Sequence, residues 1–224
     1  MTLVHGWRLF NLKRCTSHDG EVILAGQYGK HVHSSIAGRA RCRSNGKPTA
    51  FAMWQDENSD PLEDAHNLDE CPDLRCSCGY YFYRMYKGAQ KDAGSTQSVL
   101  AHITCIEETV LHTEGGRTSQ YKIDYILTPD PDTKAYLTLM GNELNTHEDY
   151  SNDFPFISYS GPQKQVNLAE EVGKIAANFG VPILDKDDLG GCQDCIRANS
   201  WRSNVEIDSF NDELRKYRKA VGRG

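Results

Sequence analysis

Apolar and polar residues alternate along much of the first two thirds of the chain, as they do in strands with one buried face. Two such segments, Val4–Leu12 and Glu21–Tyr28, are separated by the turn Ser17–Gly20 and predict a hairpin. Ser98–Ile106 and Ser119–Leu127 alternate over their whole length and predict two further strands. Short strands separated by turns are typical of a sheet or an open barrel.

The same alternation predicts which side chains share a face. In the segment that ends at Leu127, four alternate residues are expected on one buried face: Tyr121, Ile123, Tyr125 and Leu127. Three other segments are expected to form an aromatic strand, a polar loop and a turn: Tyr80–Tyr86, Lys87–Thr96 and Gly115–Gly116.

The pattern changes toward the C-terminus. Gln165–Phe179 carries apolar residues at the spacing of one helical face, and Gly180 directly after it is a typical helix stop. A last helix with an apolar stripe is expected over Asn204–Val221. The predicted α+β protein has three parts, a strand-rich core, a linker or surface arm, and a helical segment that packs on the core: residues 1–144, 145–164 and 165–224.

Length and composition indicate a globular protein with its own core. The chain has 224 residues, 38% of them hydrophobic, and a formal net charge of −6. It contains no apolar run of the roughly 20 residues that span a bilayer, and its first residues lack the basic and apolar regions of a secretory signal. We therefore expect a cytoplasmic protein whose eight cysteines are thiols or metal ligands rather than disulfides.

Three cysteines crowd a turn that precedes the aromatic strand. Cys71, Cys76 and Cys78 lie close together in sequence, and Cys42 upstream is a fourth candidate. Thiolates held by short loops are the usual ligands of structural zinc, so the sequence predicts a zinc site at these four cysteines, with His66 as a substitute for Cys71. The alternative is that they are small buried residues, as free cysteines often are.

A second cysteine pair lies near the C-terminus. Cys192 and Cys195 have the C-x2-C spacing of half a zinc ribbon or of a redox pair. The flanking Gly190–Gly191 and Asn199–Trp201 favour a loop over the strand-to-helix context of redox pairs. A second metal site, a redox pair and inert thiols all stay open, as does one shared site formed with the cysteines upstream.

Histidines supply the third candidate site. His31 and His33 are two residues apart, so a strand would present both imidazoles on one face to a catalytic metal. A third ligand would come from elsewhere, and His5, His102 and Glu107 are candidates by residue type alone. The alternative is surface histidines without a metal. Motifs for nucleotide binding, for a G-x-S-x-G nucleophile and for H-E-x-x-H zinc enzymes do not occur in the chain.

Charge is distributed unevenly. The stretch Val22–Gln55 contains no acid, and the acidic block Asp56–Asp73 follows it. One interpretation is that the two stretches are loops that face water or each other. The other is that the acid-free stretch forms a basic face for an acidic partner, with Arg39, Arg41 and Arg43 as the candidate contacts. The negative net charge argues against a protein that coats nucleic acid.

Several short motifs carry a family resemblance: Gly6–Arg8, Glu21–Gly26, Arg39–Cys42, Cys76–Tyr80 and Asn178–Pro182. Together they resemble a family of uncharacterised actinobacterial and actinophage proteins with an early GWR strand, a C-x-C-G-[IY]-Y turn and a helix ending in Y-G-V-P. The resemblance implies that Cys42 pairs with Cys76 and Cys78. It also implies a phage or actinobacterial source, and therefore the host cytoplasm for a phage protein, but it implies no activity.

These patterns predict a non-catalytic binding or regulatory protein, or a phage accessory protein, with structural Zn2+. We expect it to act through contact with a protein partner. The alternative is a metal-dependent enzyme that uses His31 and His33, and a DNA-binding regulator is the least favoured function.

Overall fold

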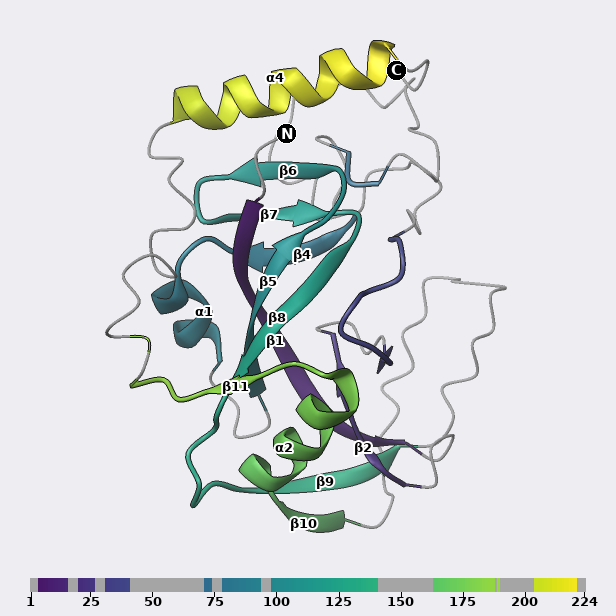
Figure 1. Ribbon diagram of the computed structural model, residues 1–224, viewed down its shortest axis with the longest axis vertical. Helices are drawn as coiled ribbons and strands as arrows, with labels where there is room; N and C mark the ends of the chain where they lie inside the picture. Colours follow the sequence, from purple (N-terminus) through teal and green to yellow (C-terminus); the bar gives the residue numbers. More distant parts are fainter. Residues whose placement is uncertain are drawn as a thin grey trace, which may run out of the picture.

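The computed structural model describes residues 4–15, 20–26, 31–40, 71–73, 78–93, 98–140, 163–187, 189 and 204–220. A strand-rich sheet with three helices in these residues confirms the predicted α+β class (Figure 1). The strands are β1 (Val4–Cys15), β2 (Val22–Ala25), β3 (His31–Val32), β4 (Tyr80–Tyr83), β5 (Ser98–Cys105), β6 (Thr109–His112), β7 (Gly115–Thr118), β8 (Tyr121–Leu127), β9 (Lys134–Met140), β10 (Gln163–Asn167) and β11 (Ile183–Leu184). The helices are α1 (Tyr86–Asp92), α2 (Leu168–Phe179) and α4 (Asn204–Ala220).

The long strand β1 organises the sheet, whose main path is β11-β8-β5-β1-β4-β7-β6. β1 pairs antiparallel with β5 from Val4 to Asn11, and it pairs with β4 at Trp7. Its second half pairs antiparallel with β2, which confirms the predicted hairpin. Because β5 also pairs with β8, three strands distant in sequence lie side by side along the middle of the sheet.

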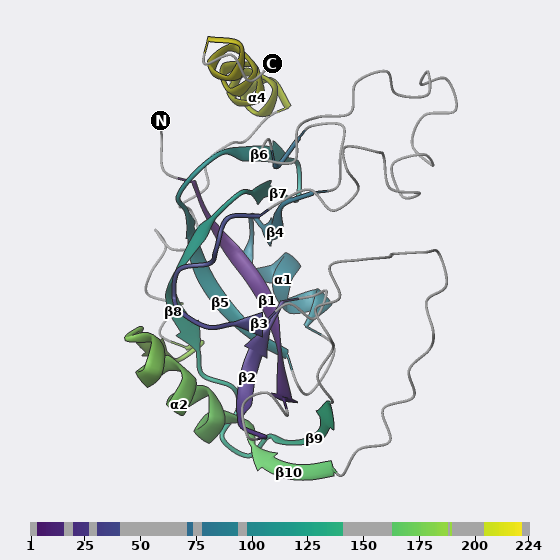
Figure 2. The same cartoon turned by 90° about the vertical axis from the view of Figure 1, so that its right-hand side faces the viewer.

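Alternate residues of these strands enter two separate hydrophobic clusters. Phe10, Val99 and Ile103 belong to the larger cluster, against which α2 packs. Trp7 and Tyr125 belong to a smaller cluster on the other face, where α1 contributes the buried Ala89. The two faces of the sheet are thus covered by different helices, as Figures 1 and 2 show.

The helix α2 begins later than the sequence indicates. We expected a helix from Gln165, but Gln163–Asn167 forms β10, an antiparallel partner of β9. The Asn167 side chain accepts a hydrogen bond from the Glu170 backbone N–H at 3.0 Å and so caps the helix. Gly180 ends the helix in the left-handed conformation, with φ of 64°, as predicted.

The expected polar loop at Lys87–Thr96 is wrong in its first half, where the chain forms α1. Only Ala89 of this short helix is fully buried, and the Tyr86 ring makes an edge-on contact with Trp7 at 5.2 Å. A helix of seven residues with one buried position gives no readable period in the sequence.

The expected turn at Gly115–Gly116 is also wrong, because both glycines lie inside β7 and the chain turns at residues 113 and 114. A Cβ atom on Gly115 would lie 1.9 Å from the Phe82 carbonyl oxygen, and one on Gly116 would lie 2.5 Å from the Phe82 ring. These glycines therefore allow the close approach of β4 rather than a turn.

The helix α4 confirms the predicted last helix and lies beside β6, at one end of the sheet (Figures 1 and 2). The buried Asn211 side chain accepts a hydrogen bond from the Leu111 backbone N–H at 3.0 Å and donates one to the Leu111 carbonyl at 3.1 Å. Arg218 is also buried and donates to the Glu108 carboxylate at 2.7 Å and to the Pro72 carbonyl at 2.6 Å. Polar contacts therefore fix this helix to β6 and to the segment around Pro72.

Two predictions about the organisation of the chain can be compared with the described residues only. Most of the expected linker 145–164 lies outside the described residues, and its last two residues belong to β10. The helices in the described residues include none long and apolar enough to cross a bilayer.

Candidate functional site

Three potential metal ligands converge from three neighbouring strands on the face that carries the smaller cluster. They are His5 of β1, His102 of β5 and Asp124 of β8, and one donor atom from each lies within 4.8 Å of the other two. The pairing register explains the approach, because His5 faces Thr104 and His102 faces Tyr125 across adjacent strands. The cluster is partly open, since the side chains of His5 and Asp124 are 29% and 25% exposed while that of His102 is 8% exposed.

A β-bulge brings Asp124 into the cluster. His102 pairs with Tyr125, but the next residue, Ile103, pairs with Ile123, so Asp124 is an extra residue on β8. The extra residue shifts the alternation of β8. Ile126 consequently enters the larger cluster, whereas Tyr125 and Leu127 enter the smaller one. The expectation that alternate residues 121–127 share one face is therefore wrong after the bulge.

Hydrogen bonds connect the cluster through Thr104. The Asp124 Oδ2 atom lies 2.9 Å from His102 Nδ1 and accepts a hydrogen bond of 2.7 Å from the Thr104 hydroxyl. The same hydroxyl oxygen lies 2.9 Å from His5 Nδ1, which is itself 3.9 Å from Asp124 Oδ2. The Thr104 hydroxyl has a single hydrogen and gives it to Asp124, so this network assigns a proton to His5 Nδ1.

The electrostatics of the cluster suit a cation. Burial opposes ionisation of Asp124, but hydrogen bonds from His102 and Thr104, together with charge interactions with His102 and His5, outweigh it and hold the pKa of the carboxyl below its ordinary value. Burial and the neighbouring His102 lower the pKa of the His5 imidazole, which is therefore neutral at neutral pH. An ionised carboxylate beside a neutral imidazole is the state in which these side chains bind metals.

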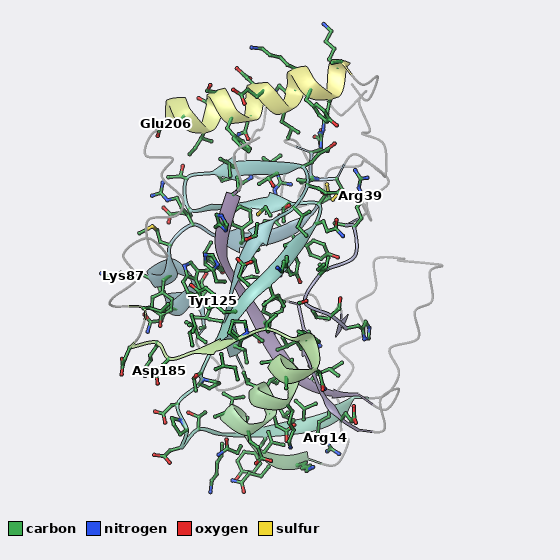
Figure 3. The ribbon with its side chains drawn as sticks, in the orientation of Figure 1. Arg14, Arg39, Lys87, Tyr125, Asp185 and Glu206 are labelled. Atoms are coloured by element: carbon green, nitrogen blue, oxygen red, sulfur yellow. The ribbon has the colours of Figure 1, made fainter. Side chains whose placement is uncertain are left out.

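Aromatic rings fix the orientation of the buried histidine. The Tyr125 ring stacks on His102 with centroids 4.9 Å apart and planes 4° apart, and Trp7 meets His102 edge-on at 5.2 Å. His5 stacks on His102 less closely, with ring centroids 5.6 Å apart and planes 17° apart. Figure 3 shows Tyr125 on the side of the sheet near α1. Burial raises the pKa of Tyr125 to about 12, and its buried hydroxyl has no hydrogen-bond partner within the described part of the chain.

The donor distances fit a metal ion after a small adjustment. Imidazole nitrogen and carboxylate oxygen bind zinc at about 2.0–2.2 Å, which places adjacent donors about 3.0 Å apart in an octahedron and about 3.4 Å apart in a tetrahedron. The His102–Asp124 distance of 2.9 Å meets the first value, and the His5–Asp124 distance of 3.9 Å exceeds the second. A shift of the His5 ring by under about 1 Å would complete the geometry.

The predicted zinc cysteines are only partly within the described residues. Cys71 is fully buried, and the Cys78 sulfur accepts a hydrogen bond from the Asp73 backbone N–H at 3.4 Å. Arg117 donates to the Cys78 carbonyl at 3.1 Å and so holds this arm of the turn. The other predicted ligands, with the substitute histidine and the second pair, lie outside the described residues: Cys42, Cys76, His66, Cys192 and Cys195.

The remaining predicted residues lie outside the cluster or are only partly described. The backbone of His31 lies in β3, and His33 follows the strand in an exposed position. Arg39 forms an ion pair of 3.3 Å with Glu107. Glu107, a predicted third ligand, is not among the three residues that converge on the metal cluster. Arg41 and Arg43 lie outside the described residues.

Sequence reasoning named two of the three ligands, His5 and His102, by residue type alone. It missed Asp124, since a bulge leaves no mark in the alternation around Tyr121–Leu127. The one available signal is that Asp124 is an acid between the buried residues Ile123 and Tyr125.

Comparison with known proteins identifies no relative: no family model, curated protein or solved structure matches the chain. The resemblance to the actinobacterial and actinophage family therefore stays a prediction from sequence.

Proposed function

We propose that the protein is a metal-dependent enzyme whose metal ion is bound by His5, His102 and Asp124. The observation that carries this proposal is the convergence of three donor side chains from β1, β5 and β8 at 2.9–3.9 Å around Asp124. Within the described residues, no lysine or arginine forms an ion pair with this carboxylate. A divalent cation would supply the missing positive charge.

The composition of the site supports catalysis over a purely structural role. Structural zinc sites are closed by four protein ligands, whereas two histidines with one carboxylate leave coordination positions open in zinc hydrolases and in non-haem iron enzymes. His5 and Asp124 are partly exposed, so a water molecule can reach an ion held by them. When bound, such an ion lowers the pKa of its water to about 7 and supplies a nucleophile at neutral pH.

The test is metal binding by the purified, metal-stripped chain. We expect one site for Zn2+, Co2+ or Mn2+ that is lost in His102→Ala and Asp124→Asn. His33→Ala is the matched control, and it also tests the alternative metal site at His31 and His33. Binding that survives both cluster substitutions but disappears in His33→Ala would refute our assignment in favour of that alternative. Hydrolysis of simple ester and phosphoester substrates by the loaded protein then tests the catalytic role.

A second candidate function follows from the cysteine turn. The described arms of this turn are held by Arg117 at Cys78 and by Arg218 at Pro72, and the Cys78 sulfur accepts a backbone N–H. We propose on this basis that structural zinc at the four predicted cysteines braces a binding or regulatory protein that acts on a protein partner in the cytoplasm. The phage or actinobacterial source belongs to the same proposal.

Zinc content separates the two candidates. If the second is correct, Cys78→Ser removes zinc and unfolds the protein, because structural zinc contributes directly to folding. If the first is correct, His102→Ala removes a metal ion and leaves the fold intact. Freely titratable thiols in the folded, metal-replete protein would exclude the cysteine site.

A further inference from the structure

We propose that the hydroxyl of Thr104 is a fourth donor of the metal site. This inference rests on the proposed function and adds a hydroxyl oxygen to the two imidazoles and the carboxylate. Thr104 lies on β5, two residues beyond His102 and opposite His5 on β1, so its side chain shares their face. It therefore stands inside the cluster rather than at its edge.

The distances place this oxygen where a ligand belongs. The four donor atoms form a chain in which His102 Nδ1 is 2.9 Å from Asp124 Oδ2, and Asp124 Oδ2 is 2.7 Å from Thr104 Oγ1. Thr104 Oγ1 is in turn 2.9 Å from His5 Nδ1. All three separations are close to the roughly 3.0 Å between adjacent donors around an octahedral ion. An ion that binds the two nitrogens and the carboxylate thus has the hydroxyl oxygen as its neighbour.

The protons of the network can be accounted for when an ion binds. The Nδ1 protons of His5 and His102 leave to solvent, and each nitrogen uses the freed lone pair to bind the ion. Thr104 keeps its hydrogen, which already points to Asp124, and the lone pair that accepted the His5 N–H becomes free for the ion. The hydroxyl therefore binds as a neutral oxygen donor, and no redox change or further reactant is needed.

The resulting donor set predicts the class of ion. Two imidazole nitrogens, one carboxylate oxygen and one hydroxyl oxygen contain no soft sulfur ligand. Such a set suits Zn2+, Fe2+, Co2+ or Mn2+ and disfavours Cu+, which prefers thiolates and thioethers. Four protein donors still leave two positions of an octahedral ion for water or substrate.

The experiment compares Co2+ binding by the wild-type chain, Thr104→Val and Thr104→Ser, using chelator competition for affinity and visible absorption for geometry. Valine keeps the shape of the threonine side chain and removes its hydroxyl oxygen, whereas serine keeps the hydroxyl oxygen. Thr128→Val is the matched control, since it removes a hydroxyl that donates to the Leu184 carbonyl elsewhere. We expect Thr104→Val to weaken Co2+ binding at least about tenfold and to change the spectrum, and Thr104→Ser and the control to resemble the wild type.

Thr104→Cys provides a test that does not depend on loss of binding. A thiolate at this position should add a sulfur-to-Co2+ charge-transfer band that disappears when His102→Ala is combined with it. Wild-type affinity and an unchanged spectrum in Thr104→Val, or no new band in folded Thr104→Cys, would overturn the fourth donor while leaving the proposed function standing. A wild-type chain that binds no ion at this cluster would overturn both.

Discussion

Two polar clusters in this protein differ in whether they contain their own counter-charge. Under α4, the buried Arg218 bonds to the carboxylates of Glu108 and Asp73 and to a backbone carbonyl. On the face near α1, Asp124 is bonded to a histidine and a threonine, and its neighbour His5 is neutral at neutral pH. The first cluster contains a permanent cation that bonds both carboxylates and holds a helix in place, whereas the second contains no lysine or arginine among its described residues and has room for a cation.

The largest expected effect is on the cluster of Arg218, Glu108 and Asp73. Arg218→Met would leave the buried Glu108 carboxylate without its cation, and we expect it to lower the free energy of unfolding by about 3–5 kcal/mol. Urea denaturation measures this change. Arg215→Met is the control, because its ion pair with Asp212 is exposed and should contribute under about 0.5 kcal/mol. Equal effects of the two substitutions would show that the buried network does not hold α4.

The second prediction concerns the cluster of His5, His102 and Asp124. A divalent ion at 100 times its dissociation constant should raise the free energy of unfolding by about 2.7 kcal/mol, since it binds only the folded chain. Thermal unfolding with and without the ion measures this gain, which should vanish in His102→Ala. The same gain should persist in Arg218→Met, because the two clusters share no residue. A gain that depended on Arg218 would mean that the clusters are coupled.

The third prediction separates the hydrogen bonds of α4 from its charges. Asn211→Ala removes both bonds to the Leu111 backbone and leaves a buried N–H and carbonyl unpaired, at a cost of about 1–3 kcal/mol. Asn178→Ala, at an exposed position of α2, is the control and should change stability by under about 0.5 kcal/mol. Denaturation of the two variants side by side decides whether Asn211 contributes as the structure indicates.

The smallest effect is expected at high pH. Tyr125 has its pKa raised to about 12 by burial, so the stability linked to its protonated form is present below pH 10 and is lost as pH rises from about 10 through about 12. Tyr125→Phe lacks this proton and should lose less stability over that window. Unfolding curves of both proteins at pH 9 and pH 11.5 test this. Identical losses would show that Tyr125 ionises as it does in the unfolded chain.

Much of the sheet could be predicted because half-buried strands alternate along the sequence. β1, β5 and the first half of β8 follow from this alternation. Helical spacing and the stop at Gly180 likewise predict the C-terminal end of α2, and an apolar stripe predicts α4. The missed elements have no such pattern. The strand β7 begins with two glycines that Phe82 requires for packing, and α1 has one buried residue. Tertiary contacts decide these segments, and local sequence does not report them.

The candidate site could be predicted only in part, because its geometry depends on pairing between distant strands. His5 and Thr104 are neighbours through the register of β1 and β5, which no local pattern contains. Asp124 enters through a one-residue bulge, and the regular alternation of β8 predicted a different face. The histidine pair that sequence spacing favoured, His31 and His33, lies in and beyond a strand of two residues.

The contact between Asn211 and β6 also affects how one molecule meets another. β6 ends the main path of the sheet, and the free edge of such a strand can pair with strands of other molecules and start aggregation. The Asn211 amide imitates a neighbouring strand, since it satisfies both the N–H and the carbonyl of Leu111. The last helix therefore covers the edge of the sheet at Leu111, where an amide side chain 100 residues away in sequence occupies the two backbone groups that a strand of another molecule would need.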